Sequence, residues 1–340
     1  MITRSFDTNG QFNVVDWTQE VNIVPNQWGT IGNLGIFQEQ SVSEYTVTFE
    51  EITKDGAILV DRVRGDRATQ GKDATRKLHS FLVPHFPHDD FISPQDLQGK
   101  RAYGSPDQAE TEAAVRARKM ERIRQNHAWT LEYARAYCIT SGTVYAPNNT
   151  VTQNWNTEFG VTRLTVDFLL GTTTTEVIAK IEAGIAQIQD NAFGASYTGT
   201  VVLTSPEFFA KLISHASVKT AYTYYQNGNQ EPLRDRLGGP ITRHRVFVFG
   251  GTTFIEMRDT YAGQRLIPVG EAYMIPTGSD VFKTYFAPAE RFGIVNTLGE
   301  QVYMFEYKDP KGTKIELETE SNFVNALLRP AMVVKFMSSN

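Results

Sequence analysis

The feature that most constrains the fold is a helical pattern over residues 105–138. Ser105-Pro106 is typical of a helix start, and Gly142 and Pro147 mark the end of the region. One stripe of mostly apolar or small residues recurs in between at steps of three and four, namely Ala113, Ala117, Met120, Ile123, His127, Leu131, Ala134 and Cys138. At about 1.5 Å per residue such a helix is roughly 50 Å long. We therefore expect a spine helix that packs on a sheet.

Length and composition indicate a globular chain of about two domains. It has 340 residues, a formal charge of -5 and 41% hydrophobic residues, which is ordinary for a soluble protein. The first ten residues lack the apolar core of a secretion signal, and no run of about eighteen apolar residues predicts a membrane span. Cys138 is the single cysteine, so no disulfide can form within the chain. We expect folding in a reducing cytoplasm.

Alternating patterns predict strands on both sides of the spine helix. Residues 41–78 are interpreted as a projecting hairpin outside the core, with a turn at Lys54-Asp55-Gly56 and a returning strand at 57–65. Residues 143–171 are expected to form strands with polar turns. A long hairpin with its turn at Asp309-Pro310-Lys311-Gly312 is expected near the C-terminus.

Two shorter helices and a further strand pair complete the pattern. Ser205-Pro206 predicts a helix start, and two strands are expected over 243–257 about Gly250-Gly251. Another helix has an apolar face formed by Ile178, Ile181, Ile185 and Ile188. The fold class is therefore α+β.

No sequence motif predicts catalysis or cofactor binding. The segment Gly65–Asp73 has five residues between its glycines and an aspartate where a phosphate-binding loop needs a hydroxyl. His127 lies on the apolar stripe and is interpreted as a hydrogen-bonded core histidine, while the helix dipole disfavours a reactive thiolate at Cys138. Potential metal ligands occur at His79, His85, His88, Asp89 and Asp90, but their spacing matches no zinc pattern.

Charged and apolar residues suggest contacts between copies of the chain. Residues 54–77 are rich in arginine and lysine, residues 300–320 are rich in glutamate, and residues 1–40 form an arm that is too apolar to be a free tail. Two solvated faces are the simpler interpretation of the charges, and complementary surfaces on adjacent copies are the sharper one. The candidate contact residues are Arg62, Arg64, Arg67, Arg76, Lys77, Glu300, Glu306, Glu316, Glu318, Glu320, Trp28, Ile36 and Phe37.

Three blocks of sequence resemble the tailed-phage major capsid proteins of the Hong Kong 97-like fold, and most closely the lambda-type major capsid protein E family. They are IPVGEAYMIPTG (267–278), FAPAERFGIVNTLGE (286–300) and ETESNFVNALLRPAMVVKF (318–336). The resemblance implies an N-terminal arm (1–40), an extended loop (41–78), a peripheral domain (79–140 with 291–322) and an axial domain (141–290 with 323–340). It also implies that the strand after Arg329-Pro330 returns from the peripheral to the axial domain.

This resemblance implies a structural protein without catalytic, cofactor or metal sites. The expected function is self-assembly through pentamers and hexamers into an icosahedral phage head, made in the host cytoplasm, that encloses double-stranded DNA without sequence specificity. Separate scaffolding and portal proteins are the expected partners, with a decoration protein as an optional one. The alternatives are an encapsulin-type compartment and, from a different class, an α+β metal-dependent hydrolase with His79, His85, His88 and Asp89 as its site.

Overall fold

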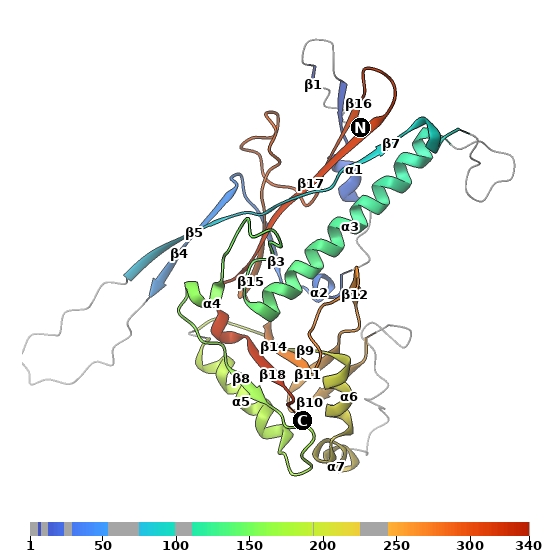
Figure 1. The fold of residues 1–340 in the computed structure, drawn as a ribbon. Helices are drawn as coiled ribbons and strands as arrows, with labels where there is room; N and C mark the ends of the chain where they lie inside the picture. The colour runs from blue at the N-terminus through green and yellow to red at the C-terminus, as the bar shows by residue number, and fades with distance from the viewer. Residues whose placement is uncertain are drawn as a thin grey trace, which may run out of the picture.

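The chain folds into an elongated body built around two sheets (Figure 1). An eight-stranded sheet lies along a long helix, and a six-stranded sheet carries shorter helices. A computed structural model describes residues 6–7, 13–23, 29–53, 75–98, 111–192, 194–224 and 244–339. The turn at Lys54-Asp55-Gly56 therefore lies outside the described residues.

The spine helix is α3, Glu112–Ser141. The hydroxyl of Thr111 accepts the N–H of Ala114 at 3.2 Å and so caps the start of the described helix. Gly142, with φ 71°, ends the helix as predicted. The expected start at Ser105-Pro106 lies outside the described residues.

The apolar stripe of α3 differs from the predicted one in its first turns. Ala113 and Ala117 are exposed, and Val115 is the first buried residue. From Met120 onward the predicted positions are buried. The stripe packs on the eight-stranded sheet, where Ile123 joins Met304 in one apolar cluster. Packing against the sheet, as expected, therefore fixes which face of the helix is buried.

The eight-stranded sheet is centred on the predicted C-terminal hairpin. Gly312, with φ 68°, allows the turn, in which its N–H donates to Asp309 O at 2.8 Å. Helices α1 (Thr18–Ile23) and α2 (Thr30–Asn33) and the short 3₁₀ turn η1 (Pro94–Asp96) flank this part of the chain. The strands are β1 (Phe6–Asp7), β2 (Asn13–Asp16), β3 (Gln38–Ser41), β6 (His85–Pro87), β7 (Asp90–Ile92), β15 (Phe282–Phe286), β16 (Tyr303–Lys308) and β17 (Ile315–Leu327).

The six-stranded sheet has the order β10-β11-β9-β14-β18-β8. Its strands are β8 (Thr165–Asp167), β9 (Gly199–Thr204), β10 (Val246–Phe249), β11 (Thr252–Glu256), β14 (Glu271–Thr277) and β18 (Val334–Met337). The shorter helices and strands near it are α4 (Trp155–Glu158), α5 (Val177–Asp190), α6 (Pro206–Ser214), α7 (Ala216–Tyr224), β12 (Thr260–Tyr261) and β13 (Gln264–Arg265).

Local signals in this half of the chain are partly confirmed. Ser205 caps α6 as predicted, because its hydroxyl accepts the N–H of Phe208 at 3.3 Å. The strand pair about Gly250-Gly251 is present as β10 and β11. On α5, Ile181 and Ile188 are buried but Ile178 is 45% exposed, so the apolar face is narrower than expected. Residues 143–171 contain the helical turn α4 and one short strand, in place of the predicted strands.

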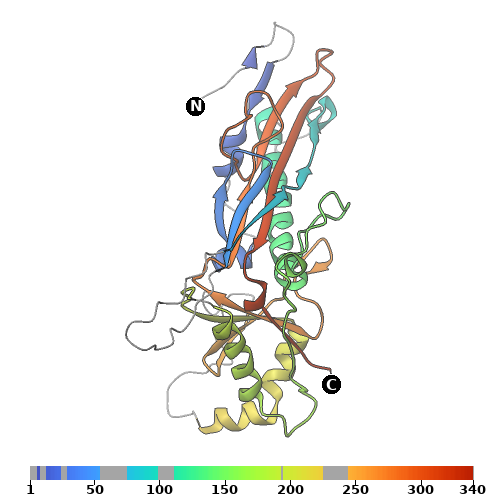
Figure 2. The same cartoon turned by 90° about the vertical axis from the view of Figure 1, so that its left-hand side faces the viewer.

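The end of the chain joins the two sheets. Strand β17 belongs to the eight-stranded sheet, the 3₁₀ turn η2 (Pro330–Met332) follows Arg329, and β18 pairs with β14 in the six-stranded sheet. The guanidinium of Arg329 donates to Ala192 O and holds this crossing in place. Figure 2 shows the change of direction between the long strands beside α3 and the terminal segment. The Arg329-Pro330 segment therefore connects the last strand of the eight-stranded sheet, β17, to β18 of the six-stranded sheet.

A separate two-stranded hairpin projects from the body (Figure 1). Its strands are β4 (Thr46–Thr53) and β5 (Thr75–Leu82), paired from Thr46↔Leu82 to Thr53↔Thr75. Because β5 is the partner of β4, the prediction that 57–65 is the returning strand is wrong. At the base of the hairpin, Val47 and Phe81 are buried in the main core. The base is thus part of the core, contrary to the expectation for residues 41–78.

Candidate functional site

The predicted basic contact residues on β5 have partners within the chain. Arg76 lies 4.0 Å from Glu50, and Lys77 Nζ lies 4.0 Å from the carboxylate of Glu158. Both basic side chains stay more than half exposed, so these pairs are worth only about 0–1 kcal/mol. They remain accessible to a neighbour. The other basic candidates, Arg62, Arg64 and Arg67, lie outside the described residues.

Three of the acidic candidates lie at the surface. Glu300 is exposed at the end of the segment between β15 and β16. Glu316 pairs with Lys314, and Glu318 pairs with Arg291. The side chains of Glu316 and Glu318 stay about two-fifths exposed. A second copy of the chain can therefore reach all three.

The other two acidic candidates are buried and bind groups of their own chain. Glu306 accepts from Arg116 Nε at 2.7 Å and from Trp17 Nε1 at 3.1 Å. Glu320 lies 3.2 Å from His85 Nδ1, and burial raises the pKa of its carboxyl. Both residues are buried within this subunit, so its structure gives no support to the prediction that they meet a neighbouring subunit, and that contact stays a prediction.

The apolar arm candidates also pack within the chain. Ile36 and Phe37 are buried in the main core. The Phe37 ring lies 5.0 Å from that of Phe282, and the Arg135 guanidinium lies 5.4 Å from its centroid. The arm therefore rests on its own subunit at these positions. Trp28 lies outside the described residues.

A buried carboxylate fixes the arm to the spine helix, a link that sequence reasoning missed. Glu132 of α3 accepts the backbone N–H of Ile31 and, at 3.1 Å, that of Gly32. Burial raises the pKa of Glu132, and the two N–H donors oppose that shift. About one turn further along α3, Arg135 Nη2 donates a hydrogen bond to the carboxylate of Glu39 at 2.7 Å. About a hundred residues separate the partners, so no local pattern reveals the contact.

The histidines proposed as metal ligands have separate partners. His79 lies between Glu51 and Glu158, at 2.9 and 2.6 Å. His85 contacts Asn322 and Glu320, and Asp89 is exposed. His88 contacts Asn126. Within the described residues, no group of three or more His, Cys, Asp or Glu side chains is placed to hold a metal ion.

Two titratable groups on the spine helix are buried as expected. His127 Nε2 lies 3.0 Å from Thr319 Oγ1, which confirms a hydrogen-bonded core histidine. Burial, with His88 and Arg124 nearby, lowers the pKa of His127 to about 3. Burial also raises the pKa of Cys138 to about 12, so the thiol is unreactive, although burial and not the helix dipole is the main cause.

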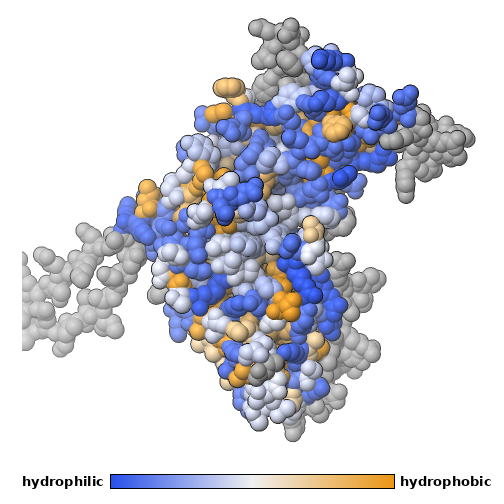
Figure 3. Space-filling model, in the orientation of Figure 1, coloured by the Kyte–Doolittle hydropathy of each residue, from blue (hydrophilic) through white to orange (hydrophobic). Residues whose placement is uncertain are grey.

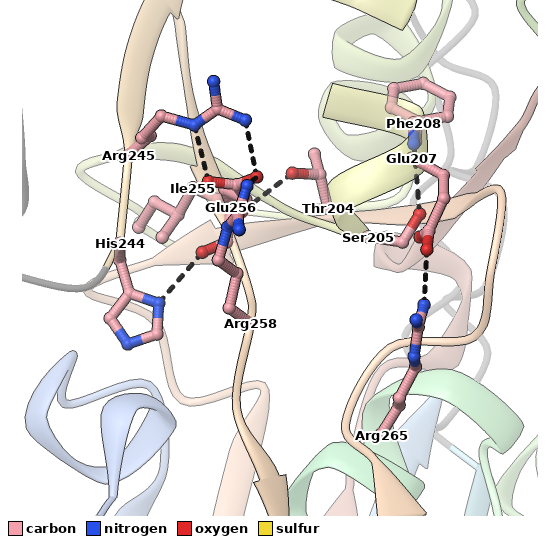
Figure 4. Close-up of polar contacts among 10 residues, drawn as sticks. All are labelled: Thr204, Ser205, Glu207, Phe208, His244, Arg245, Ile255, Glu256, Arg258 and Arg265. Carbon is pink, nitrogen blue, oxygen red and sulfur yellow. Dashed lines mark hydrogen bonds and ion pairs between the residues drawn. The ribbon is translucent and has the colours of Figure 1, made fainter. Parts of the chain in front are cut away.

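A polar cleft beside the six-stranded sheet is lined by residues that include Glu207, Arg245, Arg258 and Arg265, and Figure 4 shows the polar contacts of these side chains. The cleft has a volume of about 750 Å³. The fully buried carboxylate of Glu256 accepts from Arg245 Nε and Nη2 at 2.7 and 2.6 Å and from Arg258 Nη2 at 2.8 Å. Arg265 donates to Glu207 at 2.6 Å. Because the carboxylates of Glu256 and Glu207 both accept hydrogen bonds from guanidinium groups, neither carboxylate is available as a general base.

The Glu256 cluster is expected to be important for stability. Burial raises the pKa of Glu256, but the hydrogen bonds from Arg245 and Arg258 outweigh it and leave the pKa below its usual range. Glu256→Ala leaves the two arginines without this carboxylate, and we expect the free energy of unfolding to fall by about 3 kcal/mol. Chemical denaturation measures the loss. The matched control Glu207→Ala, which frees a half-exposed arginine, should cost about 0–1 kcal/mol. Equal losses would contradict the buried-pair argument.

The surface is largely hydrophilic, with small apolar areas (Figure 3). Three large apolar side chains are exposed on the segment between β15 and β16, namely Phe292, Val295 and Leu298. Buried Ile294 anchors this segment, and the Arg291 guanidinium lies 4.0 Å from the centroid of the Phe305 ring. Exposed apolar groups gathered on one segment are typical of a contact surface between proteins.

No helix in the described part of the chain is both long and apolar enough to cross a membrane.

Sequence comparisons connect this fold with phage capsid proteins. Residues 13–338 match the family model of phage major capsid protein E. The major capsid protein of Pseudomonas phage KPP10 is 45% identical over 339 residues, with 95% of this chain and 96% of the relative covered. The major capsid protein of Salmonella phage Felix O1 is 28% identical over 367 residues, with 98% of each chain covered.

Solved structures share the fold at much lower identity. The putative capsid protein of a prophage of E. coli CFT073 has a TM-score of 0.60 and 12% identity, with 95% of this chain and 97% of that chain covered. The capsid of cyanophage P-SCSP1u has a TM-score of 0.55 and 11% identity, with 90% and 87% covered. The Hong Kong 97-like α+β fold predicted from the sequence is therefore confirmed.

Proposed function

Because this chain belongs to the phage major capsid protein E family, it is a major capsid protein that forms a phage head shell, and we propose that it assembles through pentamers and hexamers into an icosahedral shell. The match over residues 13–338 carries this proposal. The exposed apolar side chains of Phe292, Val295 and Leu298 support it, because burial between subunits removes them from water.

We propose a domain organisation in which each of the two sheets lies mainly with one domain or with the arm. The proposed peripheral domain (79–140 with 291–322) contains nearly all of α3 and, from the eight-stranded sheet, β6, β7, β16 and the first part of β17. The proposed axial domain (141–290 with 323–340) contains the six-stranded sheet. Strand β17 crosses the proposed boundary between residues 322 and 323, and β15, which pairs with the axial part of β17 at Phe286↔Phe323, lies in the proposed axial domain although it belongs to the eight-stranded sheet. Residues 1–40 and 41–78 are the proposed arm and extended loop.

The shell is proposed to be structural and to enclose double-stranded DNA without sequence specificity. The chain carries a formal charge of -5, which is unsuited to strong binding of the phosphate backbone. Separate scaffolding and portal proteins, and a decoration protein where one is used, are the proposed partners. Assembly is proposed to occur in the host cytoplasm. The family match favours this function over an encapsulin-type compartment, and the separate partners of His79, His85 and His88 give no support to a metal-dependent hydrolase.

Electron microscopy and analytical ultracentrifugation of the full-length chain test the proposal. Expressed with its scaffolding protein, the chain should form closed, uniform particles with five-fold and six-fold clusters of subunits. Monomers or dimers alone, across a range of salt concentrations and with the scaffold present, would contradict it.

A further inference from the structure

A buried histidine joins the projecting hairpin to the body of the subunit. His79 lies on β5, and its side chain is fully buried. Its Nε2 lies 2.9 Å from Glu51 Oε2 on β4, and its Nδ1 lies 2.6 Å from Glu158 Oε1 at the end of α4. The imidazole thus bridges the hairpin and a helical turn from a distant part of the sequence.

The geometry of this bridge requires a proton. A neutral imidazole has one N–H and one lone pair, whereas an ionised carboxylate only accepts hydrogen bonds. With both ring nitrogens at hydrogen-bond distance from carboxylates, a neutral ring beside two ionised carboxylates would direct its lone pair at an oxygen. One bridging proton, on the ring or on a carboxylate, removes this repulsion. The side chains of His79, Glu51 and Glu158 therefore hold one extra proton, compared with a neutral histidine and two ionised carboxylates.

The surroundings make the bridge sensitive to that proton. The His79 ring packs against Phe159, at 5.1 Å between centroids, and against Phe49 and Phe81. The charged groups nearby are Glu51 from β4, Lys77 from β5 and Glu158 from α4, and Lys77 Nζ also donates to Glu158 O at 3.3 Å. With the proton the three bridging groups carry a net charge of −1, and without it −2.

We propose that His79, Glu51 and Glu158 form a proton-dependent latch that holds the base of hairpin β4–β5 against α4. The latch is closed while the bridging proton is present and weakens when the proton is lost at higher pH. The proposed shell function concerns contacts between subunits, whereas this latch concerns contacts within one subunit. The His79 hydrogen bond also holds the pKa of Glu158 below its usual range, so the carboxylate stays ionised into mildly acidic conditions.

Hydrogen exchange on the full-length chain tests the latch. Protection of amides in 46–53 and 76–82 is measured relative to amides in β9 and β14, after correction for intrinsic exchange. Between about pH 6 and about pH 9 the relative protection should fall about tenfold, since charge-assisted hydrogen bonds are lost. A change smaller than about twofold would overturn the proposal, because a structural contact without a bridging proton has no reason to respond over this range.

Two substitutions separate the latch from simple packing. His79→Gln holds no bridging proton, so relative protection should be low at both pH values. Glu51→Gln offers an amide that donates to the free ring nitrogen, so a neutral His79 is satisfied and protection should stay high at both. His85→Gln is the control, because His85 lies outside the bridge on β6, and it should keep the wild-type fall. A wild-type fall in Glu51→Gln would overturn the proposal even if His79→Gln failed to fold.

Discussion

Reversing Arg62, Arg64 and Arg67 to glutamate is expected to block shell assembly while leaving the subunit folded. Residues 54–77 contain seven basic and four acidic residues, a net charge of +3, and the triple substitution changes it to −3. We propose that this segment meets acidic residues of a neighbouring subunit. After the burial of Glu306 and Glu320 is taken into account, Glu300, Glu316 and Glu318 are the remaining partners.

The expected effect is large because a shell repeats each contact. An exposed ion pair contributes only about 0.2–1 kcal/mol, but a closed lattice multiplies small terms over every subunit. Repulsion between like charges also replaces the attraction. Light scattering and electron microscopy measure the loss of shells, and circular dichroism checks that the subunit stays folded.

A charge swap supplies the control for this experiment. Glu300, Glu316 and Glu318 changed to lysine in the triple-arginine variant should restore at least part of the assembly. Wild-type shells should also lose stability at high salt, since the Debye length falls to about 3 Å at 1 M. Normal shells from the triple variant, with unchanged salt resistance, would show that residues 54–77 form only a solvated face.

The features predicted correctly are those set by neighbouring residues. The end of α3 at Gly142 follows from a glycine that adopts φ 71°, and the cap at Ser205 follows from the side chain that precedes Pro206. The hairpin turn at Asp309–Gly312 follows in the same way. Each of these signals depends on backbone geometry within a few residues, so a single sequence contains all of it.

The features that the sequence does not reveal depend on partners far along the chain. Glu306 looks like a solvated residue in a charged hairpin, but Arg116, 190 positions away, meets its carboxylate beneath α3. Ile36 and Phe37 look free for another subunit, yet Phe282 of the same chain packs on Phe37. A charge or an apolar side chain predicts that a partner exists, whereas the topology decides which partner it is.

Strand pairing shows the same limit. The sequence predicts the return of the β4 hairpin at 57–65 because Asp55-Gly56 is a strong local turn signal. The observed partner of β4 is β5, so the pairing at Thr53↔Thr75 spans more than twenty residues. The alternating pattern in residues 41–78 predicts a strand, which is present as β4 (Thr46–Thr53), but the pattern contains no information on which segment pairs with it. The His79 bridge was missed for the same reason, since Glu158 enters from α4.

Lowering the pH is expected to destabilise the subunit through His127. In the folded chain burial lowers the pKa of His127 to about 3, against about 6.5 in an unfolded chain. Between these values the unfolded state binds a proton that the folded state does not. The free energy of unfolding therefore falls as the pH drops below about 6.5 and continues to fall towards about 3, by up to about 1.4 kcal/mol per pH unit.

The comparison of wild type with His127→Gln isolates this contribution. Glutamine cannot bind a proton, and its amide can still reach Thr319. Between about pH 7 and about pH 5 the wild type should lose about 2 kcal/mol more than the variant in chemical denaturation. His85→Gln is the matched control, because the His85 side chain is 51% exposed and the variant should lose as much as the wild type does. Parallel pH profiles for wild type and His127→Gln would contradict this prediction, because they would mean that His127 binds a proton as readily in the folded chain as in the unfolded chain.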